Sequence, residues 1–128
     1  MKKSALCLIV VSLVFGFNLL PAEAAVPSDT VRLYFEALKN GDTETIIQCI
    51  AGDFYEKNKV LLEKNENYPE FLRNYYQGAT LQIGDSTNSG DDVIVEMQIS
   101  FPNGNIKDKK LRLREYSDGI WRIVEEVH

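Results

Sequence analysis

The chain has 128 residues, with 14 basic and 19 acidic side chains and a formal net charge of −5. This acidic balance disfavours nucleic acid and anionic membrane surfaces as partners, because both carry negative charge themselves. The length fits a single domain with a modest hydrophobic core.

Residues 1–24 have the pattern of a secretory signal peptide. Lys2 and Lys3 form a positive start, an apolar run follows over 5–20, and Ala22-Glu23-Ala24 places small side chains where a signal peptidase reads them. The run is also short for a membrane span, which needs about 20 apolar residues. We therefore expect an exported protein, periplasmic or extracellular, that begins at Ala25, forms one domain over 25–128 and keeps no attachment to the membrane.

Cysteine and histidine are scarce in the expected mature chain. Cys49 is its single cysteine, and His128, the last residue, is its single histidine. One cysteine excludes an internal disulfide, and the scarcity of both residue types excludes zinc sites and redox pairs. The isoleucines near Cys49 predict a small buried residue on a helix rather than a reactive thiol. No metal site and no cofactor is predicted.

The first half of the domain has the apolar period of helices. We expect a first helix that ends at Asn40-Gly41, with Ser28 and Asp29 as suitable N-cap residues. Asp42 is expected to cap a second helix that runs to about Ala51.

Two further helices are predicted. The third covers about 54–64 and has Asp53 as its cap, and the fourth covers about 68–76 and is ended by Gly78. Pro69 suits the first turn of the fourth helix, where its missing N–H is harmless. The apolar face of that helix is expected to consist of Tyr68, Phe71, Leu72, Tyr75 and Tyr76.

After Gly78 the apolar period changes to the two-residue period of strands. We predict a strand over 79–83, a polar loop over 84–92 that contains Asp85, Asp91 and Asp92, and a long half-buried strand over 93–101. Two more strands follow, near 107–116 and over 120–127. The predicted fold class is α+β, with four helices followed by a four-stranded antiparallel meander covered on one face.

The strand register follows from the requirement that inward residues lie opposite one another. Leu111 lies opposite Met97 if the turn is 103–105, and Leu113 then faces Val95. A turn over 117–119 sets Leu113 opposite Ile123, and three-residue hairpins of this kind are common. One inward layer is predicted, made of Val95, Met97, Leu113, Trp121 and Ile123 packed on Tyr34, Phe35 and Phe71.

Two stretches carry a resemblance to a known superfamily. They are the opening Pro27…Thr30-Val31…Tyr34-Phe35…Ala37-Leu38…Asn40-Gly41-Asp42 and the closing Asp118-Gly119-Ile120-Trp121-Arg122-Ile123. In order and spacing they resemble the nuclear transport factor 2-like superfamily, and more narrowly its small exported bacterial domains without an assigned function. The resemblance covers 27–127 and implies a cystatin-like cone, in which N-terminal helices pack on one face of a curved four-stranded antiparallel sheet.

Members of this superfamily share shape far more than chemistry. Its ketosteroid isomerase and scytalone dehydratase types are cofactor-free enzymes. Other members bind small ligands, dimerise through the outer sheet face, or act as inhibitors or scaffolds. The resemblance therefore does not select a function.

Candidate site residues come from the inward phase of the predicted sheet and from the helices. Glu115, opposite Trp121, and Glu125, opposite Leu111, are the weak catalytic candidates, since two carboxylates in an apolar mouth can perform acid–base chemistry. The alternative is that both carboxylates are solvated near the ends of their strands. A small-molecule site edged by phenol hydroxyls is the second candidate, with Tyr34, Tyr75, Tyr76, Trp121 and Met97 as its predicted lining. The alternative for these residues is a role as core residues.

The outer sheet face is predicted to carry Lys110, Arg112 and Arg114, with Glu96 opposite Arg112 and Glu126 opposite Lys110. These are either solvated ion pairs or a surface for a homodimer or another protein. Our hypothesis is an exported, non-enzymatic domain that binds a small apolar ligand or a protein partner. The alternative is a cofactor-free lyase, isomerase or hydrolase that uses a cavity carboxylate with a tyrosine.

Overall fold

The computed structural model describes residues 26–128, so the predicted signal peptide and the predicted start at Ala25 lie outside the described residues. Four helices precede four strands in this part of the chain, and the sheet order β1-β2-β3-β4 is the predicted antiparallel meander. The helices are α3 (Pro27–Asn40), α4 (Thr43–Cys49), α5 (Gly52–Lys64) and α6 (Tyr68–Tyr75). The strands are β1 (Thr80–Ser89), β2 (Asp92–Ser100), β3 (Ile106–Glu115) and β4 (Trp121–Val127). The predicted α+β class is confirmed.

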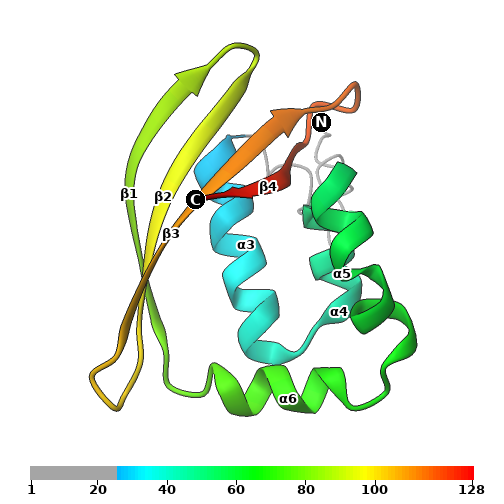
Figure 1. Ribbon diagram of the computed structural model, residues 1–128, viewed down its shortest axis with the longest axis vertical. Helices are drawn as coiled ribbons and strands as arrows, with labels where there is room; N and C mark the ends of the chain where they lie inside the picture. The colour runs from blue at the N-terminus through cyan, green and yellow to red at the C-terminus, as the bar shows by residue number, and fades with distance from the viewer. Residues whose placement is uncertain (1–25) are drawn as a thin grey trace, which may run out of the picture.

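The helices cover one face of a curved sheet (Figure 1). Helix α3 lies against the sheet at the centre of the molecule, α4 and α5 lie on its far side, and α6 crosses its C-terminal end. The core lies between α3 and the sheet. Its most deeply buried apolar side chains are Val31, Val95, Ile99, Leu111, Leu113 and Ile123. In the part of the chain that the structure describes, no helix has the length and apolar character needed to cross a membrane.

Two of the predicted helix caps are wrong and one is confirmed. Helix α3 begins at Pro27 with Val26 as its N-cap, so Ser28 and Asp29 lie in its first turn. Asp53 likewise lies in the first turn of α5, without a capping hydrogen bond from its side chain. Asp42 caps α4 as predicted, because its carboxylate accepts a hydrogen bond from the Thr45 amide at 3.1 Å.

The predicted polar loop over 84–92 is wrong, because most of it is strand. Strand β1 continues to Ser89 and pairs with β2 up to Asp92, which leaves only Gly90 and Asp91 as the turn. The register of β1 shifts between Ile83 and Ser86, so a bulge allows the polar half of β1 to stay paired. Backbone pairing here prevails over side chains with low strand propensity.

The predicted register between β2 and β3 is displaced by two residues. Leu111 lies opposite Val95 rather than Met97, and Leu113 lies opposite Val93. The turn consists of 102–104 rather than 103–105: the Gly104 amide donates to the Phe101 carbonyl, and the Phe101 amide donates to the Asn105 carbonyl at 2.8 Å. A shift of two residues keeps every side chain on its face, so the inward phase of both strands is as predicted.

The pairing of β3 with β4 is as predicted up to a bulge. Leu113 lies opposite Ile123 and Glu115 opposite Trp121, but the register shifts between Arg112 and Leu113. Ile123 and the next residue, Val124, are both buried, which breaks the alternation along β4. The predicted pairing of Glu125 with Leu111 is therefore wrong, because Glu125 lies opposite Arg112 and Glu126 takes the position opposite Leu111.

Candidate functional site

Helix α6 is fixed across the end of α3 by two close approaches of glycine. A Cβ atom on Gly41, at the end of α3, would collide with the Pro69 carbonyl oxygen. A Cβ atom on Gly78, just after α6, would lie 2.7 Å from Cγ of Pro102 in the β2–β3 turn. Both glycines have positive φ, which other residues adopt at a cost. These contacts set the orientation of α6 and thus the direction in which its side chains point.

In that orientation α6 buries only part of its predicted apolar face. Leu72 is 2% exposed, whereas Phe71 is 55% and Tyr75 is 40% exposed. The predicted place of Phe71 in the core is therefore wrong. The apolar stripe of α6 is wider than the strip of core that the helix covers, and the remainder of the stripe faces solvent.

Exposed and half-buried rings form a continuous row, which we call the aromatic face: Tyr68, Phe71, Tyr75 and Phe101. Along α6, the Tyr68 and Phe71 rings stack with centroids 6.0 Å apart, and Phe71 and Tyr75 stack at 5.7 Å. Tyr75 then meets Phe101, at the end of β2, edge-on at 5.4 Å. Such ring pairs hold each other in place, so the row is a preorganised apolar surface.

Polar groups border the aromatic face on its sheet side. The Lys107 ammonium lies 5.3 Å from the centre of the Tyr75 ring, within the range of a cation–π contact. A hollow of about 300 Å³ adjoins it, lined by Asn74, Tyr75, Phe101, Asn103, Asn105 and Lys107. This border can supply hydrogen bonds and one positive charge beside an apolar surface.

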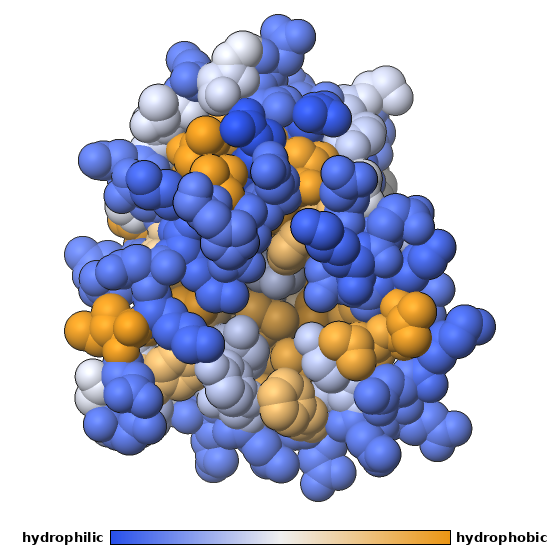
Figure 2. All heavy atoms as spheres, in the orientation of Figure 1, coloured by the Kyte–Doolittle hydropathy of each residue, from blue (hydrophilic) through white to orange (hydrophobic). Residues whose placement is uncertain are grey.

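Helix α5 carries further exposed apolar side chains, since Val60 is 61% and Leu61 is 39% exposed. Figure 2 shows separate apolar areas over α6 and on the α5 side of the same view, with charged and polar surface around them. The row of rings along α6 is the continuous apolar surface of this region, and such a surface with a polar border is typical of a binding site in a soluble protein.

The hydroxyl groups behind the aromatic face remain neutral. Burial, with smaller contributions from the nearby Tyr75, Tyr68 and Glu126, raises the pKa of Tyr76 to about 12. Burial also raises the pKa of Tyr34 above its usual range, again with Tyr76, Tyr68 and Glu126 nearby. Neutral phenols donate and accept hydrogen bonds at physiological pH but do not act as bases. The chemistry that this region supports is binding.

The two predicted carboxylates do not meet in a cavity. Glu115 lies opposite Trp121 as predicted but is exposed at the end of β3. Glu125 points to the outer face, where its Oε1 accepts a hydrogen bond from Arg112 Nε at 2.9 Å. The carboxylate on the inner side is Glu126, which lies 3.7 Å from the Lys109 ammonium. The adjacent apolar pair Ile123-Val124 was the signal for the bulge that exchanges the two glutamates.

The five predicted ligand-binding residues do not line one common hollow. Tyr75 lies on the aromatic face, with Tyr76 half-buried behind it. Trp121 lines a separate hollow of about 240 Å³ beside Cys49, and Met97 lines one of about 510 Å³ near the β1 bulge. Tyr34 is half-buried and meets Phe54 edge-on at 6.2 Å. Sequence reasoning missed Phe101 and Lys107, which adjoin the aromatic face from the sheet.

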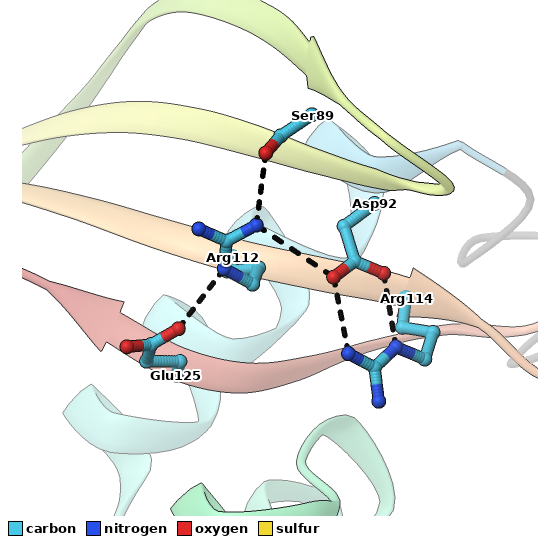
Figure 3. A network of polar contacts seen from close by, with 5 residues as sticks. All are labelled: Ser89, Asp92, Arg112, Arg114 and Glu125. Atoms are coloured by element: carbon cyan, nitrogen blue, oxygen red, sulfur yellow. Dashed lines mark hydrogen bonds and ion pairs between the residues drawn. The ribbon is translucent and has the colours of Figure 1, made fainter.

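A second polar constellation lies on the outer face of the sheet and joins all four strands (Figure 3). Asp92 accepts two hydrogen bonds from Arg114, at 2.9 and 3.1 Å. Arg112 donates to Ser89 on β1 and to Glu125 on β4, and its Nη1 also lies 3.7 Å from the Asp92 carboxylate. The predicted pairings of Glu96 with Arg112 and of Glu126 with Lys110, by contrast, were wrong, since Glu96 lies opposite Lys110 and Glu126 opposite Leu111.

The electrostatics of this constellation are those of a structural brace. Hydrogen bonds from Arg114, with further attraction from Arg112, hold the pKa of Asp92 below its usual range. Asp92 is 8% exposed, so its charge is compensated by two guanidinium groups rather than by water. The brace lies on the outer face at the end of the sheet next to the β1–β2 turn, and it leaves Asp92 ionised at physiological pH.

The chain matches no protein-family model and no curated protein. Among solved structures it is similar to a Campylobacter jejuni protein described as an NTF2-like transpeptidase, at a TM-score of 0.56 and 17% identity over 78% of this chain and 99% of that one. It is also similar to an NTF-2 like protein of unknown function from Silicibacter pomeroyi, at a TM-score of 0.55 and 16% identity over 88% of this chain and 97% of that one. It is similar as well to a SEC-C motif containing protein from Rhodopseudomonas palustris, at a TM-score of 0.55 and 17% identity over 82% of this chain and 80% of that one. At these identities the likeness concerns the fold alone.

Proposed function

We propose that this chain, which has the nuclear transport factor 2-like fold, is an exported binding domain that receives an apolar group of a partner on its aromatic face. The observation that carries the proposal is the stacked row on α6, in which Phe71 and Tyr75 stay 55% and 40% exposed. Covering such a surface lowers the free energy of the system by about 25 cal/mol per Å² of apolar area removed from water. The aromatic face therefore favours a partner that covers it.

The charges around the site favour binding over catalysis. Glu115 is exposed and Glu125 is held by Arg112 on the other face of the sheet. Behind the aromatic face, burial keeps Tyr76 protonated. Acid–base catalysis requires a group whose pKa lies near the working pH, within reach of the reacting atom. The groups beside the aromatic face supply apolar contact, hydrogen bonds and the Lys107 charge instead.

Binding of the dye anilinonaphthalene sulfonate to the folded protein tests the proposal. We expect a double variant, Phe71→Ser with Tyr75→Ser, to bind the dye about tenfold more weakly than the wild type, a change of ~1.4 kcal/mol. The matched control is Val26→Ser, which removes an apolar side chain that is 47% exposed at the start of α3. Equal dye binding by the double variant and the wild type, with both folded by circular dichroism, would overturn the proposal.

Export is the second part of the proposal and is supported by the pattern of residues 1–24. The intact mass of the protein from the periplasm or medium of its own host is expected to correspond to residues 25–128. A secreted form that retains residues 1–24 would contradict cleavage before Ala25. Native mass spectrometry of the same material is expected to detect a co-purifying small molecule where the partner is one, and the Phe71→Ser, Tyr75→Ser variant is expected to lose it.

A further inference from the structure

Strand β4 leaves part of β3 without a neighbour on one side. It pairs with 110–115 of β3, whereas residues 106–109 of β3 pair with β2 alone. Within residues 26–128 no strand lies on their other side. Figure 1 shows the consequence: β4 crosses the upper part of β3, and beyond its end no strand covers the front of α3. An open sheet edge of this kind is a template for another strand.

The turn before β3 determines which backbone groups face this open edge. The Phe101 amide donates to the Asn105 carbonyl, which makes these two residues a hydrogen-bonded pair. Bonded and non-bonded pairs alternate in antiparallel sheets, so the pair of Ile99 with Lys107 is bonded and that of Gln98 with Asp108 is not. The N–H and C=O of Asp108 therefore point to the open edge, where they can pair with a partner's backbone.

The open edge and the aromatic face belong to one surface. Lys107 lies on the edge, and its ammonium is 5.3 Å from the Tyr75 ring. Lys109, two residues on, lies 3.7 Å from Glu126 at the end of β4, whereas Lys107 has no ion pair among the described residues. A strand laid along 106–109 would thus meet backbone groups on one flank, aromatic rings on one face and an uncompensated positive charge.

We infer that the partner of the aromatic face is an extended peptide that adds to the 106–109 edge of β3 in line with β4. Its inward side chains are apolar where they lie on the aromatic face, and one inward position carries a carboxylate that meets Lys107. Main-chain hydrogen bonds supply affinity in this mode of recognition, and the pockets for alternate side chains supply specificity. This inference rests on the proposed function and names the class of partner.

The charges of the edge favour an acidic peptide over a second copy of this chain. Antiparallel pairing of two such edges about Asp108 would place Lys107 of one copy opposite Lys109 of the other. Like charges directly opposite each other destabilise a strand pair. Lysines on an exposed edge are also a common protection against pairing with the wrong strand. The same lysines attract a strand that presents carboxylates.

The probe is a blocked eight-residue peptide that carries phenylalanine and glutamate at its inward positions and threonine at its outward positions, because Lys107 and the aromatic rings lie on the same face. We expect it to bind the exported form of the protein and to slow hydrogen exchange at the Asp108 amide, with no effect on the outer edge of β1. The same peptide with alternate backbone nitrogens methylated is expected to bind roughly tenfold more weakly, because it loses the hydrogen bonds to the edge. A peptide with lysine in place of glutamate is expected to bind about tenfold more weakly as well.

Two variants at one position separate the backbone from the side chain. Asp108→Pro removes the N–H that faces the edge, at a position where an edge strand tolerates proline. Asp108→Ala keeps this N–H and removes only the carboxylate, which accepts a hydrogen bond from Gln98 at 3.0 Å. The proline variant is expected to lose about tenfold in peptide affinity and the alanine variant less than about twofold. Urea unfolding serves to check that both variants are folded. If the proline variant does not fold, the methylated peptide still tests the backbone hydrogen bonds on the wild-type protein.

The outcomes distinguish this inference from the proposed function. If the wild type binds the dye and not the peptide, or binds the methylated peptide equally well, strand addition is wrong and the aromatic face takes a ligand of another kind. If neither the peptide nor the dye depends on Phe71 and Tyr75, the proposed function itself is wrong. If the unmethylated peptide protects the Asp108 amide from hydrogen exchange and the methylated peptide does not, strand addition is supported.

Discussion

Phe71 and Leu72 are adjacent on α6 and are expected to respond very differently to truncation. Leu72 is 2% exposed and is the buried residue of the helix, so Leu72→Ala leaves a cavity beneath α6. Changes of this kind cost about 2–5 kcal/mol of the free energy of unfolding. Phe71 is 55% exposed, so truncation there removes a side chain that water already reaches.

The cost of Phe71→Ala follows from its exposure. About 45% of a side chain of ~200 Å² is covered, which is roughly 90 Å² and an upper limit of about 2 kcal/mol at 25 cal/mol per Å². Alanine also favours the helix over phenylalanine by about 0.5 kcal/mol. Part of the cover comes from Tyr68 and Tyr75 on the same helix, and such local pairs contribute only tenths of a kcal/mol. We therefore expect a net loss of about 1 kcal/mol.

Urea unfolding of the two variants, followed by far-ultraviolet circular dichroism, measures the difference directly. The expected order is a loss for Leu72→Ala at least twice that for Phe71→Ala, with unchanged slopes against urea. If Phe71→Ala cost about 3 kcal/mol or more, as a buried phenylalanine does, Phe71 would belong to the core. The aromatic face would then be closed, and the binding proposal would lose its basis.

Three further predictions concern other parts of the molecule. Burial raises the pKa of Cys49 to about 12, so a thiol reagent at pH 8 is expected to label it slowly until urea unfolds the protein; equal rates in both states would contradict its burial. The lowered pKa of Asp92 contributes stability that is present above about pH 4 and is lost as pH falls through the folded-state value, so wild type and Asp92→Asn should differ steadily from pH 7 to 5 and converge in stronger acid. Glu115→Gln and Glu125→Gln are expected to retain dye and peptide binding, and a folded variant that lost both would restore a role for its carboxylate.

The sequence predicts the elements and the faces of this fold well because both depend on local periods. The switch from helical to strand period after Gly78, the order of the strands and the inward phase of β2 and β3 all follow from apolar spacing. The β2–β3 register was displaced by two residues because apolar phase cannot distinguish pairings that differ by an even number. The Gly104 turn, which decides between them, depends on backbone geometry.

The candidate site was harder to predict because it depends on which apolar residues of α6 extend beyond the part of the helix that the core covers. Tyr75 and Tyr76 were expected at a ligand site, yet nothing in the spacing of Phe71 and Leu72 shows that one is exposed and the other buried. That difference comes from the orientation of α6, which contacts distant in sequence impose. The partners Phe101 and Lys107 come from the sheet, and the register error had displaced β3 relative to β2.

The orientation of α6 can itself be tested at Gly78. With φ at +76°, Gly78→Ala strains the backbone, and the new Cβ would also lie 2.7 Å from Cγ of Pro102 in a turn that has little freedom to move. Gly119 is the matched control, because its φ is +81° and nothing lies within 4 Å of the corresponding Cβ position. Gly119→Ala should therefore cost only the left-handed strain, about 1–2 kcal/mol. Gly78→Ala should cost measurably more in urea unfolding and should also alter dye binding, since α6 must shift. Equal losses for the two variants would mean that the contact with Pro102 does not hold α6, and that another feature of the fold sets the exposure of Phe71.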